Sequence, residues 1–402
     1  MSSLLGDMEN LLRKNKELVR VVVRKINEYW YLYSRKTGIS RLKIMDFCGT
    51  HEWTITHYGI RSLIPQGIEL VAGPGCPVCV TPSHYVEELI KLALDGIVVY
   101  TYGDVYKLRS HKGVNNIYSL SEARAVGGDI RLVSDILVAI NDARKHNKPS
   151  VFAGIGFETI APGYAQAILR ATIPSNMKIL SLVKLTPPAM FYTLEVSREK
   201  PTEPPIMGVI APGHVSTITG AKAWEPVAEN YEIPVVVSGF EPVDVLVSIM
   251  EILRQLVKGE SRVVIEYVRA VSYHGDLTAQ SLMWRVFNMV DDAWRGIGFL
   301  PKSGLRLREE YSEYDAFKEY GVRELNPADW KYDMPMGCRC AEVVLGKAYP
   351  SQCPLFLKAC TPQKPIGPCM VSIEGTCAIW AKYGSRELLL KLSSELKSEL
   401  GA

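Results

Sequence analysis

The stretch IELVAGPGCPVCVTPSHYVEELIKLAL, residues 68–94, contains the pattern that decides the fold. It begins with a short apolar run, Ile68–Ala72, which is typical of a buried strand. A loop of Gly, Pro and Cys follows, and from about residue 83 the apolar side chains recur at helical spacing. The sequence therefore predicts a strand, a loop of unusual composition and a helix, in that order.

The same order recurs along most of the chain. Seven more apolar runs are candidate strands, most of them followed by a loop with Gly or Pro: Leu42–Phe47, Ile97–Tyr102, Ser150–Gly154, Ile179–Val183, Ile206–Ile210, Val235–Val237 and Val263–Val268. Helical patterns lie near residues 4–35, 83–95, 133–147, 161–171, 241–258 and 277–292. Alternating strands and helices favour parallel sheets covered on both faces. We therefore expect an α/β fold with two doubly wound parallel-sheet modules that face a cleft.

The expected domains follow the order of the chain. Residues 1–40 form an N-terminal helix, 41–149 and 150–262 form two modules divided near Pro149, and 263–402 form a C-terminal domain. Beyond about residue 300 the chain becomes charged and Tyr-rich, and then dense in Cys, Pro and Gly. Such a segment has little apolar periodicity, so a metal cluster is the natural candidate for ordering it. A closing helix is expected over Ser385–Leu400.

Composition limits the classes of function. The chain has 402 residues, is 47% hydrophobic and 22% charged, and has a net charge of +3, which is ordinary for a globular protein and gives no basic footprint for nucleic acid. No apolar run approaches the roughly 20 residues needed to cross a bilayer. The first residues mix both charge signs and lack an apolar signal-peptide core. We therefore expect a cytoplasmic protein that binds neither nucleic acid nor membrane.

The nine cysteines form two groups. Six crowd into residues 338–377: Cys338, Cys340, Cys353, Cys360, Cys369 and Cys377. In a reducing compartment clustered cysteines indicate metal ligands or redox pairs, and six suit a four-cysteine iron–sulfur cluster with one spare pair. Spacing alone does not choose the four ligands. The gaps do not match a paired zinc-ribbon pattern, although a zinc site and scattered buried thiols remain alternatives.

The other three cysteines lie in loops after predicted strands. Cys76 and Cys79 form a C-x-x-C motif, with Thr81 and Pro82 placed to begin a helix. A nearby helix N-terminus lowers a thiol pKa, so dithiol–disulfide exchange is plausible chemistry for this pair. Cys48 ends the first strand, and His51 follows three residues later, a pairing suited to an activated nucleophile or a mixed sulfur–nitrogen metal site. A buried structural cysteine is the alternative for Cys48.

Two further loops place polar side chains beside Gly and Pro. Glu158 lies in GFETIAP and His214 in APGHVST. Because open α/β sheets bind ligands beyond the carboxyl ends of their strands, we expect these loops and the three cysteines to line one shared cleft. The chain lacks the dinucleotide fingerprint and the P-loop motif, so a nucleotide site is unsupported.

Together these motifs resemble those of the HypD family of [NiFe]-hydrogenase maturation proteins. The likeness extends from about residue 40 to 383 and rests on FCGTHE at 47–52, GPGCPVC at 73–79, GFETIAP at 156–162, APGHVST at 211–217, GFEP at 239–242 and the six-cysteine tail. Two departures stand out. Trp53 occupies a position where the family commonly has His, and the residues after TYGD, which includes Asp104, differ from the usual continuation.

The resemblance implies two α/β modules around a cleft and a C-terminal [4Fe–4S] domain. The family's cluster spacing falls on Cys338, Cys353, Cys360 and Cys377. It leaves Cys340 and Cys369 as a second redox dithiol, with Cys76 and Cys79 as the first. Cys48 matches the thiol that holds iron while ligands are installed, and His51, Glu158 and His214 are candidates for proton delivery or anion positioning.

The function expected from the resemblance is assembly of the Fe(CN)2CO part of the hydrogenase active site. A HypC-type chaperone would share a transient Fe(II) that acquires CN and CO ligands, a HypE-type partner would donate cyanide from a thiocyanate, and the hydrogenase large subunit would be served indirectly. Electrons would pass from the cluster through the dithiols by thiol–disulfide exchange. The alternatives are an iron–sulfur thiol–disulfide reductase acting on a protein disulfide and a zinc-stabilised binding module.

Overall fold

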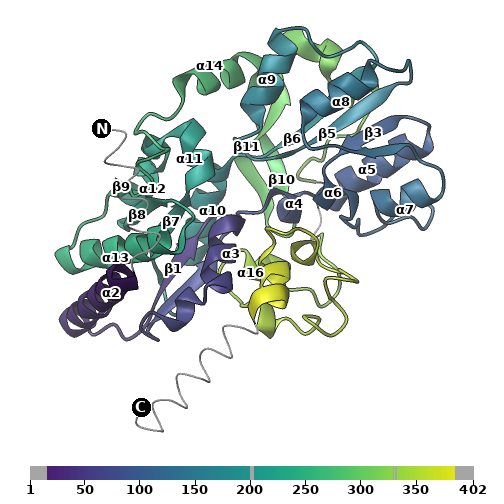
Figure 1. Cartoon of the computed structure of the whole chain (residues 1–402). Helices are drawn as coiled ribbons and strands as arrows, with labels where there is room; N and C mark the ends of the chain where they lie inside the picture. The colour runs from purple at the N-terminus through teal and green to yellow at the C-terminus, as the bar shows by residue number, and fades with distance from the viewer. Residues whose placement is uncertain (1–15, 200–202, 329, 331–332, 385–402) are drawn as a thin grey trace.

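The computed structural model describes residues 16–199, 203–328, 330 and 333–384, and has an α/β architecture. Within those residues the strands form two parallel sheets and one antiparallel hairpin (Figure 1). The expectation of parallel sheets flanked by helices is confirmed. No helix in these ranges combines the length and apolar character needed to span a membrane. The helix expected over Ser385–Leu400 lies outside the described residues.

The first sheet has the strand order β2-β1-β7-β8-β9. Its strands are β1 (Leu42–Asp46), β2 (Ile68–Ala72), β7 (Ile206–Pro212), β8 (Val235–Ser238) and β9 (Val263–Ile265). One face is covered by α2 (Lys16–Thr37), α3 (Gly49–His57) and α13 (Pro242–Lys258). Apolar side chains from these helices and strands form a single buried cluster that includes Ile26, Ile44 and Ile249.

The second sheet has the order β4-β3-β5-β6. Its strands are β3 (Val98–Thr101), β4 (Ile130–Leu132), β5 (Ser150–Gly156) and β6 (Met177–Val183). On one face lie α8 (Ile136–Ala143), α9 (Ala161–Leu169) and α14 (Leu277–Val286). On the other lie α5 (Ser83–Leu94) and α7 (Leu120–Ala125), in a core that continues into the first sheet. The two sheets are therefore joined by shared apolar packing.

The sheets do not follow the predicted division near Pro149. The chain begins in the first sheet with β1 and β2, crosses to the second sheet for β3 to β6, and returns to the first with β7. Strand β1 pairs with β7, more than 150 residues later, with Met45 opposite Val209. Each module is therefore discontinuous in sequence, and strands on both sides of Pro149 share one sheet.

The remaining helices are short except for α10, and several of them follow strands. They are α4 (Pro77–Val80), α6 (Gly103–Tyr106), α10 (Thr186–Glu199), α11 (Gly213–Thr219), α12 (Glu225–Tyr231), α15 (Ala316–Glu319) and α16 (Cys340–Val343). Single 3-10 turns occur at η1 (Ile60–Ser62), η2 (Ala221–Trp224), η3 (Glu309–Tyr314), η4 (Pro350–Gln352) and η5 (Pro368–Met370). These short helices after strands place the motif loops at the carboxyl ends of the sheets.

The helix predicted over 277–292 is wrong in its second half. Helix α14 ends at Val286, and β10 (Phe287–Trp294) pairs with β11 (Gly298–Leu307) as an antiparallel hairpin. The turn between the strands contains Gly296 at φ +71° and Gly298 at φ +144°, a backbone conformation that glycine tolerates best. The side chains of Phe287 and Trp294 are fully buried, so tertiary packing outweighs the local helical pattern.

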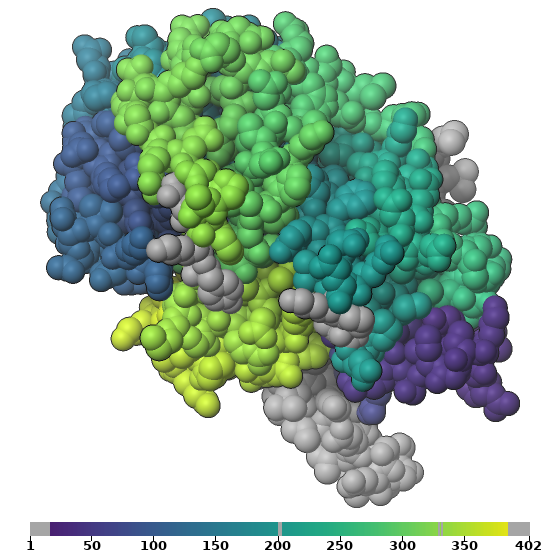
Figure 2. Space-filling view, turned by 180° about the vertical axis from the view of Figure 1, so that it is seen from behind, coloured from purple at the N-terminus to yellow at the C-terminus, as the bar shows by residue number. Residues whose placement is uncertain are grey.

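The cysteine-rich segment, residues 333–384, lies at the base of the molecule. Figure 2 shows it from behind, in contact with both the earlier blue segments and the teal ones. Before a helix that begins at Thr376 it contains only the short helix α16, the 3-10 turns η4 and η5, and irregular turns. Its buried Cys and Met side chains extend the apolar core that joins the sheets. The segment therefore packs against the same side of the molecule on which the motif loops lie.

Candidate functional site

A cavity of about 210 Å³ lies where the strand-end loops meet. It is lined by residues from both sheets and from the cysteine-rich segment: Phe47, Cys48, Gly75, Pro77, Ile155, Gly156, Phe157, Thr159, Ile160, Pro212, His214, Val215 and Glu374. We call this cavity the Cys48 pocket. The prediction that the Cys48, Cys76 and His214 loops share one cleft is therefore confirmed.

The loops that contain Cys48 and Cys76 touch through their backbones. The N–H of Gly49 donates a hydrogen bond of 3.2 Å to the carbonyl oxygen of Gly75. A Cβ at Gly75 would lie 2.5 Å from the carbonyl carbon of Phe47 and 2.6 Å from the backbone nitrogen of Cys48. Only glycine permits this approach, because both neighbouring atoms belong to the backbone. The glycine of GPGC thus brings the two cysteine loops together.

The Cys48 thiol is neutral in the metal-free chain. Burial, followed by the nearby negative charge of Glu374, raises its pKa to about 12. Glu374 is itself partly buried, and its pKa is raised by burial and by the charge of Asp104. A thiol in such surroundings becomes a thiolate when a cation replaces its proton. The pocket therefore suits a bound cationic metal better than a free nucleophile.

Cys76 and Cys79 form a disulfide with a Cα–Cα distance of 5.3 Å. The Cys76 sulfur also accepts a hydrogen bond of 3.2 Å from the Cys79 N–H at the start of α4. Both residues are almost fully buried, and their neighbours Gly75 and Pro77 line the Cys48 pocket. The C-x-x-C motif therefore lies directly behind the pocket in its oxidised form.

The two predicted histidines both stack on one aromatic ring. Phe240, from GFEP, stacks on His51 at 4.7 Å and on His214 at 4.0 Å between ring centroids. His51 is fully buried, and its Nε2 lies 3.2 Å and 2.9 Å from the carbonyl oxygens of Ser238 and Gly239. Since carbonyls only accept, Nε2 of His51 must hold the proton. His214 is exposed and lines the pocket. His51 does not line the pocket but packs against Phe240, on which His214 stacks.

Glu158 does not line the Cys48 pocket. Its buried carboxyl group accepts hydrogen bonds from the Thr186 N–H at 2.6 Å and the Thr186 hydroxyl at 2.9 Å. Burial raises its pKa to about 7. Thr186 is the first residue of α10, so Glu158 satisfies the free N–H at that helix start. Its neighbours Phe157 and Thr159 are the residues of GFETIAP that reach the pocket.

The six C-terminal cysteines are all buried and free of disulfides. The sulfurs of Cys338, Cys369 and Cys377 lie close enough to Cys340 to shift its pKa. The backbone N–H groups of Ile366 and Gly367 point at the sulfur of Cys360, at 3.2 Å and 3.5 Å. Within the described ranges, no group of three or more His, Cys, Asp and Glu side chains is arranged so that it could hold a metal ion. All six thiols are buried, and the two N–H groups at Cys360 are of the kind that stabilise sulfur ligands.

The cysteine-rich segment also meets the disulfide loop. Helix α4, which contains Cys79, packs against η5, which contains Cys369. Cys340 in turn lies close enough to Cys369 to raise its pKa. The C-x-x-C loop therefore contacts both the Cys48 pocket and the turn that contains Cys369.

Sequence reasoning did not propose a role for several residues in or around the pocket, although Asp104 and the motif that contains Glu52 were noted. Glu374 lines the pocket, and Asp104 accepts hydrogen bonds from the Ser372 hydroxyl at 2.8 Å and the Ile373 N–H at 3.1 Å, which fixes the segment that carries Glu374. Glu52 of CGTHE is buried, pairs with Arg61 at 2.7 Å, and accepts from the Trp380 indole at 2.6 Å. The TYGD loop, residues 101–104, thus lies close to the SIEGTC stretch, residues 372–377. Neither stretch alone predicts this contact.

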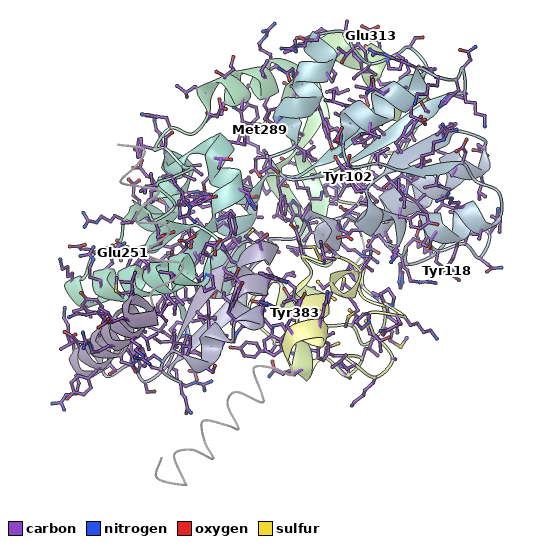
Figure 3. All side chains as sticks on the ribbon, in the orientation of Figure 1. Tyr102, Tyr118, Glu251, Met289, Glu313 and Tyr383 are labelled. Atoms are coloured by element: carbon purple, nitrogen blue, oxygen red, sulfur yellow. A yellow bond between two sulfur atoms is a disulfide. The ribbon has the colours of Figure 1, made fainter. Side chains whose placement is uncertain are left out.

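Trp53, the departure from the family pattern, has a packing role. Its ring stacks on His57 at 4.5 Å. Tyr383, labelled in Figure 3 beside the C-terminal segment, meets the rings of Trp53 and His57 edge-on at 6.0 Å and 4.8 Å. Trp53 also lines an open groove of about 780 Å³ that shares Glu374 with the Cys48 pocket. The substitution thus forms part of the surface next to the pocket.

Comparison with known proteins identifies the family of this chain. The HypD family model, described as a hydrogenase formation family, matches residues 18–384. The chain belongs to the HypD family. A hydrogenase expression/formation protein of Methanocaldococcus jannaschii is 40% identical over 372 residues, covering 92% of this chain and 98% of that protein.

Two bacterial members of the HypD family are similar over most of their length. The hydrogenase maturation factor HypD of Cupriavidus necator is 38% identical, covering 86% of this chain and 90% of that protein. The hydrogenase maturation factor HypD of Azotobacter vinelandii is 37% identical, covering 85% of this chain and 89% of that protein. The resemblance noted in the motifs is therefore confirmed across the fold, and the chain is a member of a family of hydrogenase maturation factors.

Proposed function

We propose that this HypD-family chain assembles the Fe(CN)2CO unit of a [NiFe]-hydrogenase, together with a HypC-type chaperone and a HypE-type cyanide donor. The hydrogenase large subunit would receive the unit indirectly. The observation that best supports this role is the Cys48 pocket itself. Cys48 and the accessible His214 line it where the two sheets meet, and the C-x-x-C disulfide lies directly behind it.

Cys48 is proposed to hold the iron that is being modified. Iron is here the cargo, and its binding displaces the thiol proton that burial and Glu374 hold in place. A cysteine of the chaperone would supply a second thiolate. The 780 Å³ groove beside Gly49 and Thr50 would give a small protein access to this position. His214, exposed at the pocket, is placed to hold an incoming anion or a proton.

The Cys76/Cys79 pair is proposed to release cyanide from the donor. When reduced, the two thiolates give two electrons to a thiocyanate, R–S–CN. The sulfur–carbon bond breaks, cyanide leaves to the iron, the donor keeps R–S⁻, and Cys76 and Cys79 become the disulfide seen in the structure. Atoms and charge balance, because two thiolates yield one disulfide while the thiocyanate yields one thiolate and one cyanide.

Cys340 and Cys369 are proposed to restore the first pair. A thiolate of Cys369 attacks the Cys76–Cys79 disulfide, and Cys340 then attacks the mixed disulfide, leaving two thiolates at Cys76 and Cys79. The packing of α4 against η5 supports this route. A [4Fe–4S] cluster on Cys338, Cys353, Cys360 and Cys377 would supply the single electrons that return Cys340 and Cys369 to thiols. The buried thiols and the N–H groups at Cys360 fit such a group.

The test uses the full chain purified without oxygen together with its chaperone. Iron and sulfide content, absorption near about 400 nm and infrared bands of bound cyanide and CO are measured. Cys48→Ala is expected to lose the infrared bands and keep the absorption. Cys360→Ala is expected to lose the absorption, and Cys340→Ala to keep it.

The opposite outcomes would contradict the proposal. Infrared bands of bound cyanide that persist in Cys48→Ala would show that Cys48 does not hold the iron. A chain that reduces protein disulfides equally well with and without Cys48 would favour the thiol–disulfide reductase. A colourless chain with stoichiometric zinc would favour the binding module.

A further inference from the structure

The segment after β9 lies against the two loops that carry Phe240 and His214. Tyr267 follows β9 by two residues, and its backbone N–H donates to the Val237 carbonyl of β8 at 3.1 Å. Its ring meets the Phe240 ring edge-on, at 5.7 Å between centroids. The residue is partly buried, and none of the motifs in the sequence contains it. The carboxyl ends of β8 and β9 therefore meet at one aromatic contact.

The turn before His214 packs against both of these rings. A Cβ at Gly213 would lie 3.0 Å from Cδ1 of Tyr267 and 3.2 Å from Cε2 of Phe240. His214, the next residue, stacks on the same Phe240 ring at 4.0 Å and lines the Cys48 pocket. The two rings thus form a wall behind the backbone that carries the imidazole.

A charged side chain covers the Tyr267 ring. The guanidinium carbon of Arg269 lies 4.5 Å from the ring centroid, within the range of a cation–π contact. One terminal nitrogen of Arg269 also donates to the buried Asp244 carboxylate at 3.2 Å. Asp244 in turn accepts from the Glu241 N–H at 3.1 Å. Arg269 therefore ties the Tyr267 ring to the GFEP loop, which carries Phe240.

The backbone of the GFEP loop has two further anchors. The Gly239 N–H donates to the Glu266 carboxylate at 2.9 Å, and the Thr54 hydroxyl donates to the Phe240 carbonyl at 2.7 Å. Because the backbone is held on both sides, the orientation of the Phe240 ring depends on the rings that contact it. These are Tyr267 and the two histidines.

We propose that Tyr267 is a positioning residue for His214: its ring keeps Phe240 stacked on the imidazole and supports the turn at Gly213, so that His214 stays at the wall of the Cys48 pocket. This inference rests on the proposed function, in which His214 holds an incoming anion or a proton there. Edge-to-face contacts have a preferred geometry, so one ring fixes the orientation of the next. Tyr267 itself does not line the pocket.

The test records the surroundings of His214 in the full chain, purified without oxygen. The protein carries carbon-13 histidine, and His214→Asn assigns the ring signals. Stacking on Phe240 should shift the His214 ring protons upfield, because they lie over the face of an aromatic ring. Tyr267→Leu keeps an apolar side chain without the edge-on contact. It is expected to move these signals toward their positions in the unfolded chain, and to raise several-fold the rate at which diethyl pyrocarbonate modifies His214 relative to the exposed His111.

Two substitutions serve as controls. Tyr267→Phe keeps the ring and is expected to leave the His214 signals and modification rate unchanged. Tyr231→Leu removes another partly buried tyrosine, which packs on Phe191 at 6.1 Å between ring centroids, and should also leave His214 unchanged. Where Tyr267→Leu does not fold, Arg269→Met removes the guanidinium that covers the ring. It is expected to move the His214 signals in the same direction by a smaller amount.

The outcomes distinguish the inference from the proposed function. Unchanged His214 signals in folded Tyr267→Leu, or in Arg269→Met where that variant does not fold, overturn the positioning role. An equal change in Tyr267→Phe or Tyr231→Leu overturns it as well.

Transfer of cyanide, measured with the chaperone and the donor present, tests the role of His214 itself. If His214→Asn transfers cyanide as fast as the unmodified chain, that part of the proposed function fails, while changed His214 signals in Tyr267→Leu would still support the positioning role. Slower transfer in His214→Asn and Tyr267→Leu, but not in Tyr267→Phe or Tyr231→Leu, supports both.

Discussion

At the scale of single residues, His51 and His214 lie close together because each follows a strand. Their place in the sequence does not predict their burial or their protonation. His51 and His214 both follow strands and both face Phe240, yet one is buried and the other is exposed. Burial lowers the pKa of His51 to about 4, more than its hydrogen bonds to the Ser238 and Gly239 carbonyls raise it. The two histidines therefore offer different chemistry from similar loops.

We predict that His51 stays neutral above pH 5 with its proton on Nε2. Nitrogen-15 spectra of histidine-labelled protein, assigned with His51→Asn, should show one histidine whose signals do not move between pH 5 and 8. Since the unfolded chain takes up a proton near pH 6.5 and the folded chain does so only near 4, His51 also lowers the unfolding free energy as pH falls through that window. A His51 titration near pH 6.5 would contradict this description.

The sequence predicted which loops meet, but it did not predict every side chain in the pocket. Cys48, His214 and the loop of Cys76 were placed together because parallel strands present their carboxyl ends at one edge. Glu374 comes from a segment without strand or helix periodicity, so no pattern rule locates it. Glu158 shared the loop signature but faces Thr186, because which way a loop side chain points depends on its tertiary neighbours.

At the scale of elements, the contact between the two cysteine loops depends on one glycine. Gly75→Ala would place a methyl group 2.5 Å from the Phe47 carbonyl group, and the backbone there cannot move as a flexible side chain would. We expect a loss of about 1–3 kcal/mol in unfolding free energy, the usual cost of overpacking. Denaturant unfolding followed by circular dichroism measures it.

The matched control is Gly103→Ala in α6, where an added Cβ meets no atom within 4 Å. This variant should keep the stability of the unmodified chain or gain slightly, because alanine suits a helix better than glycine. Equal effects of the two substitutions would show that the close approach at Gly75 is not needed.

Glu158 gives a second prediction at this scale, through the start of α10. Its pKa is about 7 in the folded chain and close to 4.5 when unfolded, so the folded state holds more protons between these pH values. Its contribution therefore makes the unfolding free energy fall as pH rises from about 4.5 to 7. Glu158→Gln should reduce the slope of unfolding free energy against pH by up to about 1.4 kcal/mol per pH unit, which corresponds to one proton.

Urea unfolding at several pH values measures the slope. Glu319→Gln, a substitution of an exposed carboxylate, should leave it unchanged. A slope that is the same in Glu158→Gln as in the unmodified chain would show that Glu158 is ionised throughout.

The elements themselves were largely predictable, and the exceptions have physical causes. The predicted strands near Ile68, Ser150 and Val235 all form, because each is a short apolar run bounded by turn residues. Strand β4 is only Ile130–Leu132 and gives no such signal. The sequence of strand β10 predicts a helix, because a local pattern carries no information about pairing with β11 across the turn at Gly296.

At the scale of the whole molecule, the discontinuous modules explain how distant motifs come to share a pocket. Strands β1 and β7 are neighbours, which brings FCGTHE beside APGHVST, while β5 of the other sheet contributes GFETIAP. Pairing between strands so far apart depends on long-range packing, about which composition carries no information. The predicted division of the chain near Pro149 therefore could not be corrected from the sequence. The crossings between sheets place the pocket at the junction rather than inside either module.

The cysteine-rich segment is held at this junction by contacts to the rest of the chain. Asp104 accepts hydrogen bonds from the Ser372 hydroxyl and the Ile373 N–H. We predict that Asp104→Ala leaves both donors without their acceptor and loosens residues 372–377, while Glu52 still holds Trp380. Deuterium exchange followed by mass spectrometry should show peptides over 372–377 exchanging at least several-fold faster, with β1 and β5 unchanged.

The control is Asp135→Ala, because Asp135 likewise accepts from two backbone N–H groups, those of Leu137 and Val138, at the start of α8 in the second sheet's module. Its loss should speed exchange only near α8. If Asp104→Ala leaves 372–377 protected, the segment is held by Glu52 and by core packing alone. If both variants loosen the same peptides, the effect is global unfolding. A local effect would mean that the TYGD loop fixes the position of Glu374 and thereby the charge facing Cys48.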